Sequence, residues 1–298
     1  MAVIDQVVML FLIILVGLAS RKKNMLTDET IRGVTLLTVH VAVPALSIVN
    51  FQRTFSPEIL GGIVLTFFAS AALMLLFLAL AHFLFRKKSA ARRAVLTHLF
   101  SFSNCGFMGY PLILSISPDF FIYAIAFNAS FNLLCWTLGC ALFQQSSGAL
   151  DWKRAVLSPA VLAIVVGLTL FCAQIRLPAF LCDTLNMLGS LTTPLSMLLI
   201  GSRMAGLRLR DFADRDYHLG AFMRLAVSPL LCAALLSPFH LPQPVFVTVV
   251  LLMAMPGASV AVMQAELYGG DYPFAARAVA YSTLLSLVTI PLVTLILL

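Results

Sequence analysis

The chain has 298 residues, of which 61% are hydrophobic and only 10% are charged, and its mean hydropathy is +1.02. A water-soluble domain of this length does not need so large an apolar fraction for its core, so the composition predicts a protein surrounded by lipid. The formal net charge of +7 does not indicate nucleic acid as a partner, because the basic residues lie in small groups between apolar runs.

Charged and Pro/Gly-rich breaks divide the chain into ten apolar segments, each long enough to cross a bilayer as a helix. Five lie at about 3–20, 31–51, 60–85, 94–116 and 119–143, and five at about 154–173, 179–204, 218–237, 244–268 and 274–297. No basic residue precedes the first segment, whereas Arg21, Lys22 and Lys23 follow it. A cleaved signal has the opposite polarity, so we expect this segment to remain as the first helix of an all-α polytopic membrane protein.

Basic residues concentrate in alternate loops. One set of loops holds most of them: Arg21, Lys22, Lys23, Arg32, Arg86, Lys87, Lys88, Arg92, Arg93, Lys153, Arg154, Arg203, Arg208, Arg210 and Arg215. The other set holds only Arg53 and Arg176. Since cytoplasmic loops carry the excess of Lys and Arg, we expect the first set inside the cell, both termini extracytoplasmic, and the chain in the cell (inner) membrane.

The two halves share a pattern of helix-weakening residues. Pro194 lies 150 residues after Pro44, each closely followed by Leu and Ser, and Pro256 lies 150 residues after Gly106. A second copy of five helices must enter the membrane upside down, which predicts a five-plus-five inverted repeat. The expected units are a first repeat at 1–143, a cytoplasmic connecting loop at 144–153 and a second, inverted repeat at 154–298.

Two of the expected helices contain mid-span breakers. The fourth reads SFSNCGFMGYPL, with Gly106, Gly109 and Pro111, and the ninth reads MAMPGASVAVMQAELY, with Pro256 and Gly257. We expect both helices, four and nine, to be broken at these residues. Unwound backbone inside a membrane protein must be buried or line a cavity, and the N-termini of the half-helices would favour an anion there.

Neutral polar side chains accompany the two breaks. Asn104 carries an amide that can donate to a carboxylate, and Asn128 and Asn132 share one face of the fifth helix. Ser259 and Gln264 lie in the ninth helix. The alternative is that these side chains only bridge neighbouring helices.

Charged and metal-ligating residues give weaker indications of a functional site. Arg224 in the eighth helix and Arg277 in the tenth lie near the cytoplasmic boundary, so we expect them to snorkel; the alternative is that either turns inward and attracts an anion. His40, His82 and His98 lack ligand spacing. We therefore expect no metal, no cofactor and no catalytic residues, and an intramembrane enzyme is disfavoured because no Ser/His pair, paired carboxylates or metal cluster is visible at membrane depth.

The fourth helix, with Asn104, Met108-Gly109 and Pro111-Leu112, resembles the signature of the auxin efflux carrier (AEC) family, which includes plant PIN-type carriers and bacterial malate permeases. The ninth helix is similar as well, and so is the stretch from Ser286 to Pro291. The ninth-helix residues that carry the likeness are Ala254, Met255, Pro256, Ala265 and Tyr268. The resemblance spans the whole chain.

The resemblance implies a ten-helix inverted repeat in which helices 1, 2, 6 and 7 form a scaffold and a homodimer surface, and helices 3–5 and 8–10 form a moving transport domain. Substrate is then expected at the crossover of helices four and nine, with Asn104 and Pro111 at the motif positions, and transport follows elevator-like alternating access. Three positions depart from the family pattern: Cys105 replaces a common Thr, Tyr110 a smaller aliphatic residue, and Ala261 the ninth-helix Pro of plant carriers. These departures favour a small mono- or dicarboxylate over an auxin-like aromatic acid.

The sequence thus predicts a secondary transporter of small organic anions that resides in the lipid bilayer. Alternatives are a sodium-coupled organic-anion symporter of the bile-acid-transporter type and a membrane substrate sensor or channel; proton and sodium both stay open as coupling ions. The predicted substrate-binding residues are Asn104, Cys105, Gly106, Tyr110, Pro111, Asn128, Asn132, Pro256, Ser259, Ala261 and Gln264.

Overall fold

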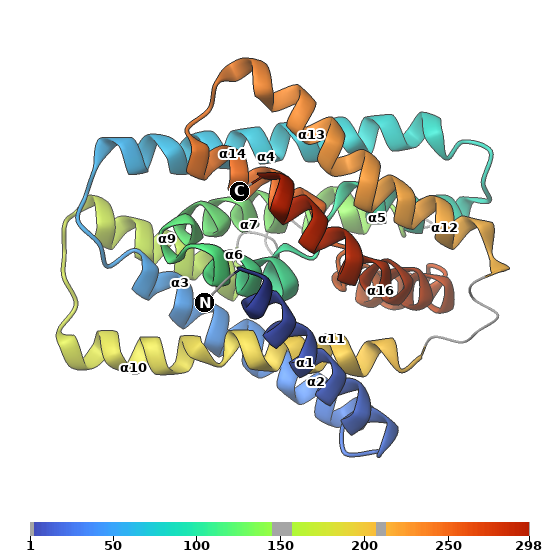
Figure 1. Cartoon of the computed structure of the whole chain (residues 1–298), viewed down its shortest axis with the longest axis horizontal. Helices are drawn as coiled ribbons and strands as arrows, with labels where there is room; N and C mark the ends of the chain where they lie inside the picture. Colours follow the sequence, from blue (N-terminus) through green and yellow to red (C-terminus); the bar gives the residue numbers. More distant parts are fainter. Residues whose placement is uncertain (1–2, 145–156, 207–212, 298) are drawn as a thin grey trace.

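The computed structural model describes residues 3–144, 157–206 and 213–297, and these form helices joined by short loops, with no strand among them (Figure 1). The first half contains α1 (Val3–Lys22), α2 (Asp28–Leu37), η1 (Thr38–Ala42), α3 (Val43–Asn50), α4 (Pro57–Leu84), α5 (Ala90–Ser101), η2 (Cys105–Gly109), α6 (Tyr110–Ile116), η3 (Pro118–Phe120), α7 (Phe121–Leu134) and η4 (Cys135–Gly139). The second half contains α9 (Pro159–Cys172), α10 (Ala179–Ser190), α11 (Thr192–Met204), α12 (Arg215–Phe222), η6 (Met223–Val227), α13 (Ser228–Leu236), η7 (Ser237–Phe239), α14 (Gln243–Ala254), α15 (Val260–Leu267) and α16 (Tyr272–Leu297).

Several of these helices are long and apolar enough to cross a bilayer. In the described residues they are the continuous helical stretches Asp28–Asn50, Pro57–Leu84, Pro118–Gly139, Arg215–Phe239 and Tyr272–Leu297. Shorter apolar helices cover Cys105–Ile116, Pro159–Cys172 and Gln243–Ala254. This all-helical, apolar architecture is that of a polytopic membrane protein, as the sequence predicts. The ten-helix inverted repeat stays a prediction, and most of its connecting loop, from residue 145 on, lies outside the described residues.

Three prolines inside helices are accommodated by widened turns. The π-helical turns η1, η2 and η6 end two residues before Pro44, Pro111 and Pro229, respectively. Proline lacks an N–H donor and its ring clashes with the carbonyl four residues earlier, and a π-turn moves that carbonyl out of the way. Helical structure therefore continues through these prolines.

The break in the fourth predicted helix lies earlier than expected. Gly106, Gly109 and Pro111 belong to the helical stretch η2–α6, and the unwound residues are 102–104, between α5 and η2. Pro111 lies inside this continuous stretch, where the π-turn η2 accommodates its ring, so it does not interrupt the helix. In the ninth predicted helix the break runs through residues 255–259, between α14 and α15, where Pro256 and Gly257 indicate it.

The helices pack in groups on either side of the interrupted ones. Figure 1 shows α10 and α11 in the lower part of the view and α4 in the upper part, with α5, α6 and α7 between them. α1 lies along α11, α3 packs on both α9 and α10, and α4 lies along α7.

Two glycines allow the backbones of α1 and α11 to touch. A Cβ at Gly17 would lie 2.3 Å from the carbonyl oxygen of Leu198, and a Cβ at Gly201 would lie 1.9 Å from that of Ile14. Both distances are far below van der Waals contact, and the opposing atoms are backbone atoms that cannot move aside. Small residues at such contacts are how helices associate closely in lipid, where the hydrophobic effect between helices is weak.

Ionic contacts join the start of α5 to the start of α12. Arg92 Nη1 lies 2.7 Å from Asp216 Oδ2, Arg92 Nη2 lies 3.1 Å from Asp214 Oδ2, and Lys88 also pairs with Asp216. The Arg92 guanidinium lies over the Phe274 ring, 4.8 Å from its centroid. Lys88 and Arg92, which the sequence assigns to one side of the membrane, therefore lie against the start of α12.

Gly201→Ala should lower the free energy of unfolding by roughly 1–3 kcal/mol, because the added methyl group forces α1 and α11 apart. The measurement is thermal unfolding of the purified protein in detergent. Gly33→Ala is the matched control, since a Cβ at Gly33 in α2 meets nothing within 4 Å. Equal unfolding temperatures for the two variants would contradict the packing argument.

Candidate functional site

The two unwound segments pair with each other through their backbones. Asn104 N donates to Pro256 O at 2.8 Å, Ala258 N donates to Phe102 O at 3.1 Å, and Ser103 lies opposite Gly257 in an isolated antiparallel bridge. Buried backbone amides must find partners, and here each segment supplies them to the other. The crossing of the two interrupted helices is thus built from main chain.

Asn104 forms the tight turn of the crossing. Its φ and ψ of −77° and 56° and the bond from Cys105 N to Ser103 O (2.8 Å) define an inverse γ-turn. The turn aims the side chain at α15, where Asn104 Nδ2 lies 3.4 Å from Ser259 Oγ. Ser259 precedes α15 but does not cap it with its side chain, so its hydroxyl is free to face Asn104. Both residues are buried, with exposed fractions of 4% and 6%.

A chain of amides from α7 supports the same turn. Asn132 Nδ2 donates to Asn128 Oδ1, and Asn128 Nδ2 donates to Tyr110 Oη, both at 2.8 Å. Cys105 Sγ lies 3.7 Å from Asn128 Oδ1, and a Cβ at Gly106 would lie 3.9 Å from Asn128 Nδ2. The structure therefore brings the predicted residues of η2 and α7 together behind Asn104.

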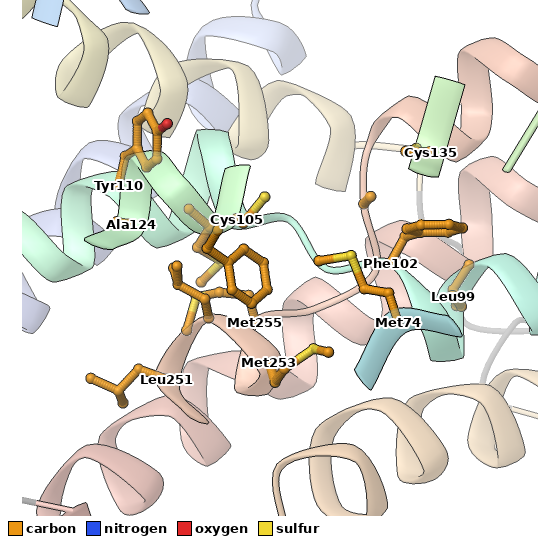
Figure 2. Packing of buried hydrophobic residues seen from close by; sticks show 14 of the residues in the cluster. Met74, Leu99, Phe102, Cys105, Tyr110, Ala124, Cys135, Leu251, Met253 and Met255 are labelled. Atoms are coloured by element: carbon orange, nitrogen blue, oxygen red, sulfur yellow. The ribbon is translucent and has the colours of Figure 1, made fainter. Parts of the chain in front are cut away.

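Tyr110 is fixed in this cluster. Its ring is fully buried and packs edge-on against Phe121, with the centroids 4.7 Å apart. Figure 2 shows Cys105 close to Met255, whereas the Tyr110 ring points away from both. Tyr110 therefore lies behind the crossing and braces α6 against α7.

Gln264 belongs to a separate polar cluster. Its Nε2 donates to Cys135 O at 2.9 Å, and its Oε1 lies 3.1 Å from His98 Nε2, so it connects α15 to α5 and η4. All three side chains are fully buried. Pro111 and Ala261 are also buried, in the first turns of α6 and α15, and add apolar surface. Gln264 therefore bonds residues other than Asn104 here, and its role as a substrate-binding residue stays a prediction.

Arg224 does not snorkel, and the expectation that it does is wrong. Its side chain is fully buried in η6, where Nη1 donates to Phe100 O and Nε to Met255 O, both at 2.8 Å, and Nη2 donates to Met253 O. The last carbonyls of a helix have no partner within the helix and carry partial negative charge. The C-terminal ends of α5 and α14 draw the guanidinium inward for this reason.

A second arginine reaches the crossing from α11. Arg203 Nη1 donates to Ser259 O at 3.3 Å, at the start of α15. Sequence reasoning missed this residue because it counted Arg203 among the loop cations. A charge inside the predicted span 179–204 was the available signal, since ionised residues within spans are rare and usually face the protein interior.

The crossing is distinct from a cavity of about 790 Å³. Described residues at the C-terminal end of α4 and in the first turns of α5 bound this cavity. Its lining includes His82, Arg93, Thr97, Phe143 and Gly270. None of the eleven predicted binding residues lines it. The predicted site is therefore not part of this cavity.

The polar atoms at the crossing are chiefly hydrogen-bond donors and neutral groups. Asn104 offers an amide NH₂, Ser259 a hydroxyl and Arg203 a guanidinium. In the described parts of the chain no group of three or more His, Cys, Asp or Glu side chains could hold a metal ion. Such a donor set suits the oxygens of an anion better than a cation.

A family model described as membrane transport protein matches residues 2–294. The chain belongs to this family. It is the auxin efflux carrier family that the motifs of the fourth and ninth helices indicate. An uncharacterized transporter of Methanothermobacter thermautotrophicus is 26% identical over 294 residues, covering 97% of this chain and 96% of the relative. The uncharacterized transporter YfdV of Escherichia coli K12 is 23% identical over 296 residues, covering 95% and 94%. The protein is therefore a membrane transport protein.

Gln264→Ala should lower the free energy of unfolding by roughly 1–3 kcal/mol, because it leaves the buried carbonyl of Cys135 and the ring of His98 without their partner. Thermal unfolding in detergent measures this. Gln243→Ala, which removes an exposed glutamine at the start of α14, should unfold at the wild-type temperature. A wild-type unfolding temperature for Gln264→Ala as well would show that this polar cluster does not stabilise the fold.

Proposed function

We propose that this membrane transport protein is a secondary transporter that carries small organic anions, such as mono- and dicarboxylates, by way of the crossing of α5–α6 and α14–α15. The observation that carries the proposal is the meeting of the Asn104 amide, the Ser259 hydroxyl and the Arg203 guanidinium at that crossing. These donors come from three elements that are far apart in sequence.

The chemistry of a carboxylate fits these groups. Each carboxylate oxygen accepts hydrogen bonds, and charge-assisted bonds are roughly twice as strong as neutral ones. The bond between Asn104 and Ser259, at 3.4 Å, is long for a hydrogen bond, so exchanging it for a bond to an anion costs little. Arg203 and the N-terminus of α15 add positive potential beside the two donors.

The surroundings of the crossing favour a small substrate. Phe102, Cys105 and Met255 are fully buried around it, and Figure 2 shows them within one packed cluster. An aromatic acid needs more room than these side chains leave. A compact mono- or dicarboxylate needs less rearrangement of the cluster.

We further propose elevator-like movement, with α1–α3 and α9–α11 as scaffold and α4–α7 and α12–α16 as transport domain. The packing of α1 on α11 and of α3 on α9 and α10 supports the grouping of the scaffold. Arg203 of α11, in the proposed scaffold, donates to Ser259 O, in the proposed transport domain. An elevator-like movement breaks this polar contact and replaces it with others. In this proposal the protein is a homodimer through scaffold helices, in the cell membrane with both termini extracytoplasmic.

Purified protein in proteoliposomes should show saturable uptake of radiolabelled malate, in competition with lactate and succinate and less with indole-3-acetate. Asn104→Ala and Pro111→Ala should reduce this flux at least about tenfold, the first because it removes the amide donor and the second because the π-turn η2, no longer needed to accommodate a proline, can tighten and displace Asn104. Asn50→Ala is the matched control: Asn50 bonds Leu46 O within α3, away from the crossing, and its removal should leave flux unchanged.

Unchanged flux in both variants would refute the site. Binding of the acids, detected by thermal shift, without any flux would favour a substrate sensor instead. Uptake measured with and without sodium, and at several pH values, tests the sodium-coupled alternative.

A further inference from the structure

The guanidinium of Arg224 lies where the first halves of both interrupted helices end. It donates to Phe100 O near the end of α5, and to Met253 O and Met255 O at the end of α14. Ser228 Oγ, one turn later, adds a bond to Met253 O at 3.3 Å. The arginine is fully buried, so these carbonyls are its surroundings in place of water.

No carboxylate balances this charge within the described part of the chain, where the ion pairs belong to Arg21, Arg53, Lys88 and Arg92. The balance comes from the helices. The C-terminus of a helix carries about half a negative elementary charge, so two converging ends offset roughly one positive charge. One guanidinium matches the two ends in charge.

The three carbonyls adjoin the residues that form the crossing. Phe100 O lies two residues before Phe102, whose carbonyl accepts from Ala258 N, and Met255 directly precedes Pro256, whose carbonyl accepts from Asn104 N. Arg224 therefore ties the two chain segments together just before they pair. This tie lies directly beside the backbone bond that holds Asn104.

We propose that Arg224 is a fixed cation that takes the place of a bound monovalent cation at the helix crossing. It neutralises the converging C-terminal ends of α5 and α14, and it positions the backbone of Asn104 and Pro256 for the substrate. Arg224 is thus a positioning residue, not a substrate ligand, and the crossing needs no inorganic cation to assemble. The part of this proposal that concerns substrate rests on the proposed transport function; the part that concerns the crossing does not.

The test compares wild-type protein with Arg224→Ala, Arg224→Gln and Arg224→Lys. Each is assayed for thermal unfolding in detergent and for malate flux in proteoliposomes, in salts of sodium, guanidinium or the bulky N-methylglucamine at equal, low millimolar concentration. Arg86→Ala is the matched control, because it removes the same charge from an exposed arginine.

We expect Arg224→Ala and Arg224→Gln to lose at least about tenfold in flux and to unfold at lower temperature, while Arg86→Ala does neither. Arg224→Lys should recover most of the flux, because it restores the charge. Guanidinium should raise both the unfolding temperature and the flux of Arg224→Ala and leave the wild type unchanged. Wild-type unfolding temperature should be the same in sodium and N-methylglucamine salts.

Wild-type stability and flux in Arg224→Gln would overturn the proposal, because a neutral donor would then suffice. So would a sodium-dependent rise in the unfolding temperature of the wild type, or identical behaviour of Arg224→Ala in all three salts. Should no substrate flux be found in the wild type, the transport proposal fails, but the unfolding temperatures still decide the role of Arg224. Arg224→Lys and Arg224→Gln keep the test open if Arg224→Ala does not fold.

Discussion

The architecture depends on how buried, unwound backbone finds hydrogen-bond partners. A chain in lipid cannot leave amides and carbonyls unpaired, because each unsatisfied group costs several kcal/mol. The segments at residues 102–104 and 255–259 solve this by pairing with one another, and Arg224 takes the carbonyls that remain at the ends of α5 and α14. Asn104 and Ser259 can therefore face each other at a place where an uninterrupted helix would hide its polar backbone.

Burial of Arg224 carries a desolvation penalty, which the hydrogen bonds of its guanidinium must offset. Removing an ion from water costs several kcal/mol in proteins, even after the structure relaxes. Hydrogen bonds to a charged group contribute about 1.5–3 kcal/mol each, and Arg224 donates to three carbonyls at helix ends. The two quantities are comparable, so a buried guanidinium is tolerable here and would not be tolerable against an apolar helix face.

Rigid packing on one side of the molecule contrasts with adaptable packing on the other. Gly17 and Gly201 bring the backbones of α1 and α11 into contact, which leaves these helices little freedom to slide. The interrupted helices meet instead through a few hydrogen bonds and through flexible side chains such as Met253 and Met255. A long bond such as that between Asn104 and Ser259 is easily exchanged. This division supports the proposed grouping into a scaffold and a transport domain.

The sequence by itself determined the all-helical membrane fold, the family and the segments that carry the two breaks, because hydropathy and the residues around Asn104 and Pro256 are local properties of the chain. The sequence placed the first break several residues after its true position at 102–104. The reason is that a proline accommodated by a π-turn has the same sequence signature as a proline that ends a helix. The tertiary structure alone decided that Gln264 bonds His98 and that Arg224 and Arg203 turn inward. Their partners are carbonyls of other helices, and a backbone carbonyl has the same identity at every position of a sequence. Only the fold, by bringing helix ends together, makes some of those carbonyls the place for a cation.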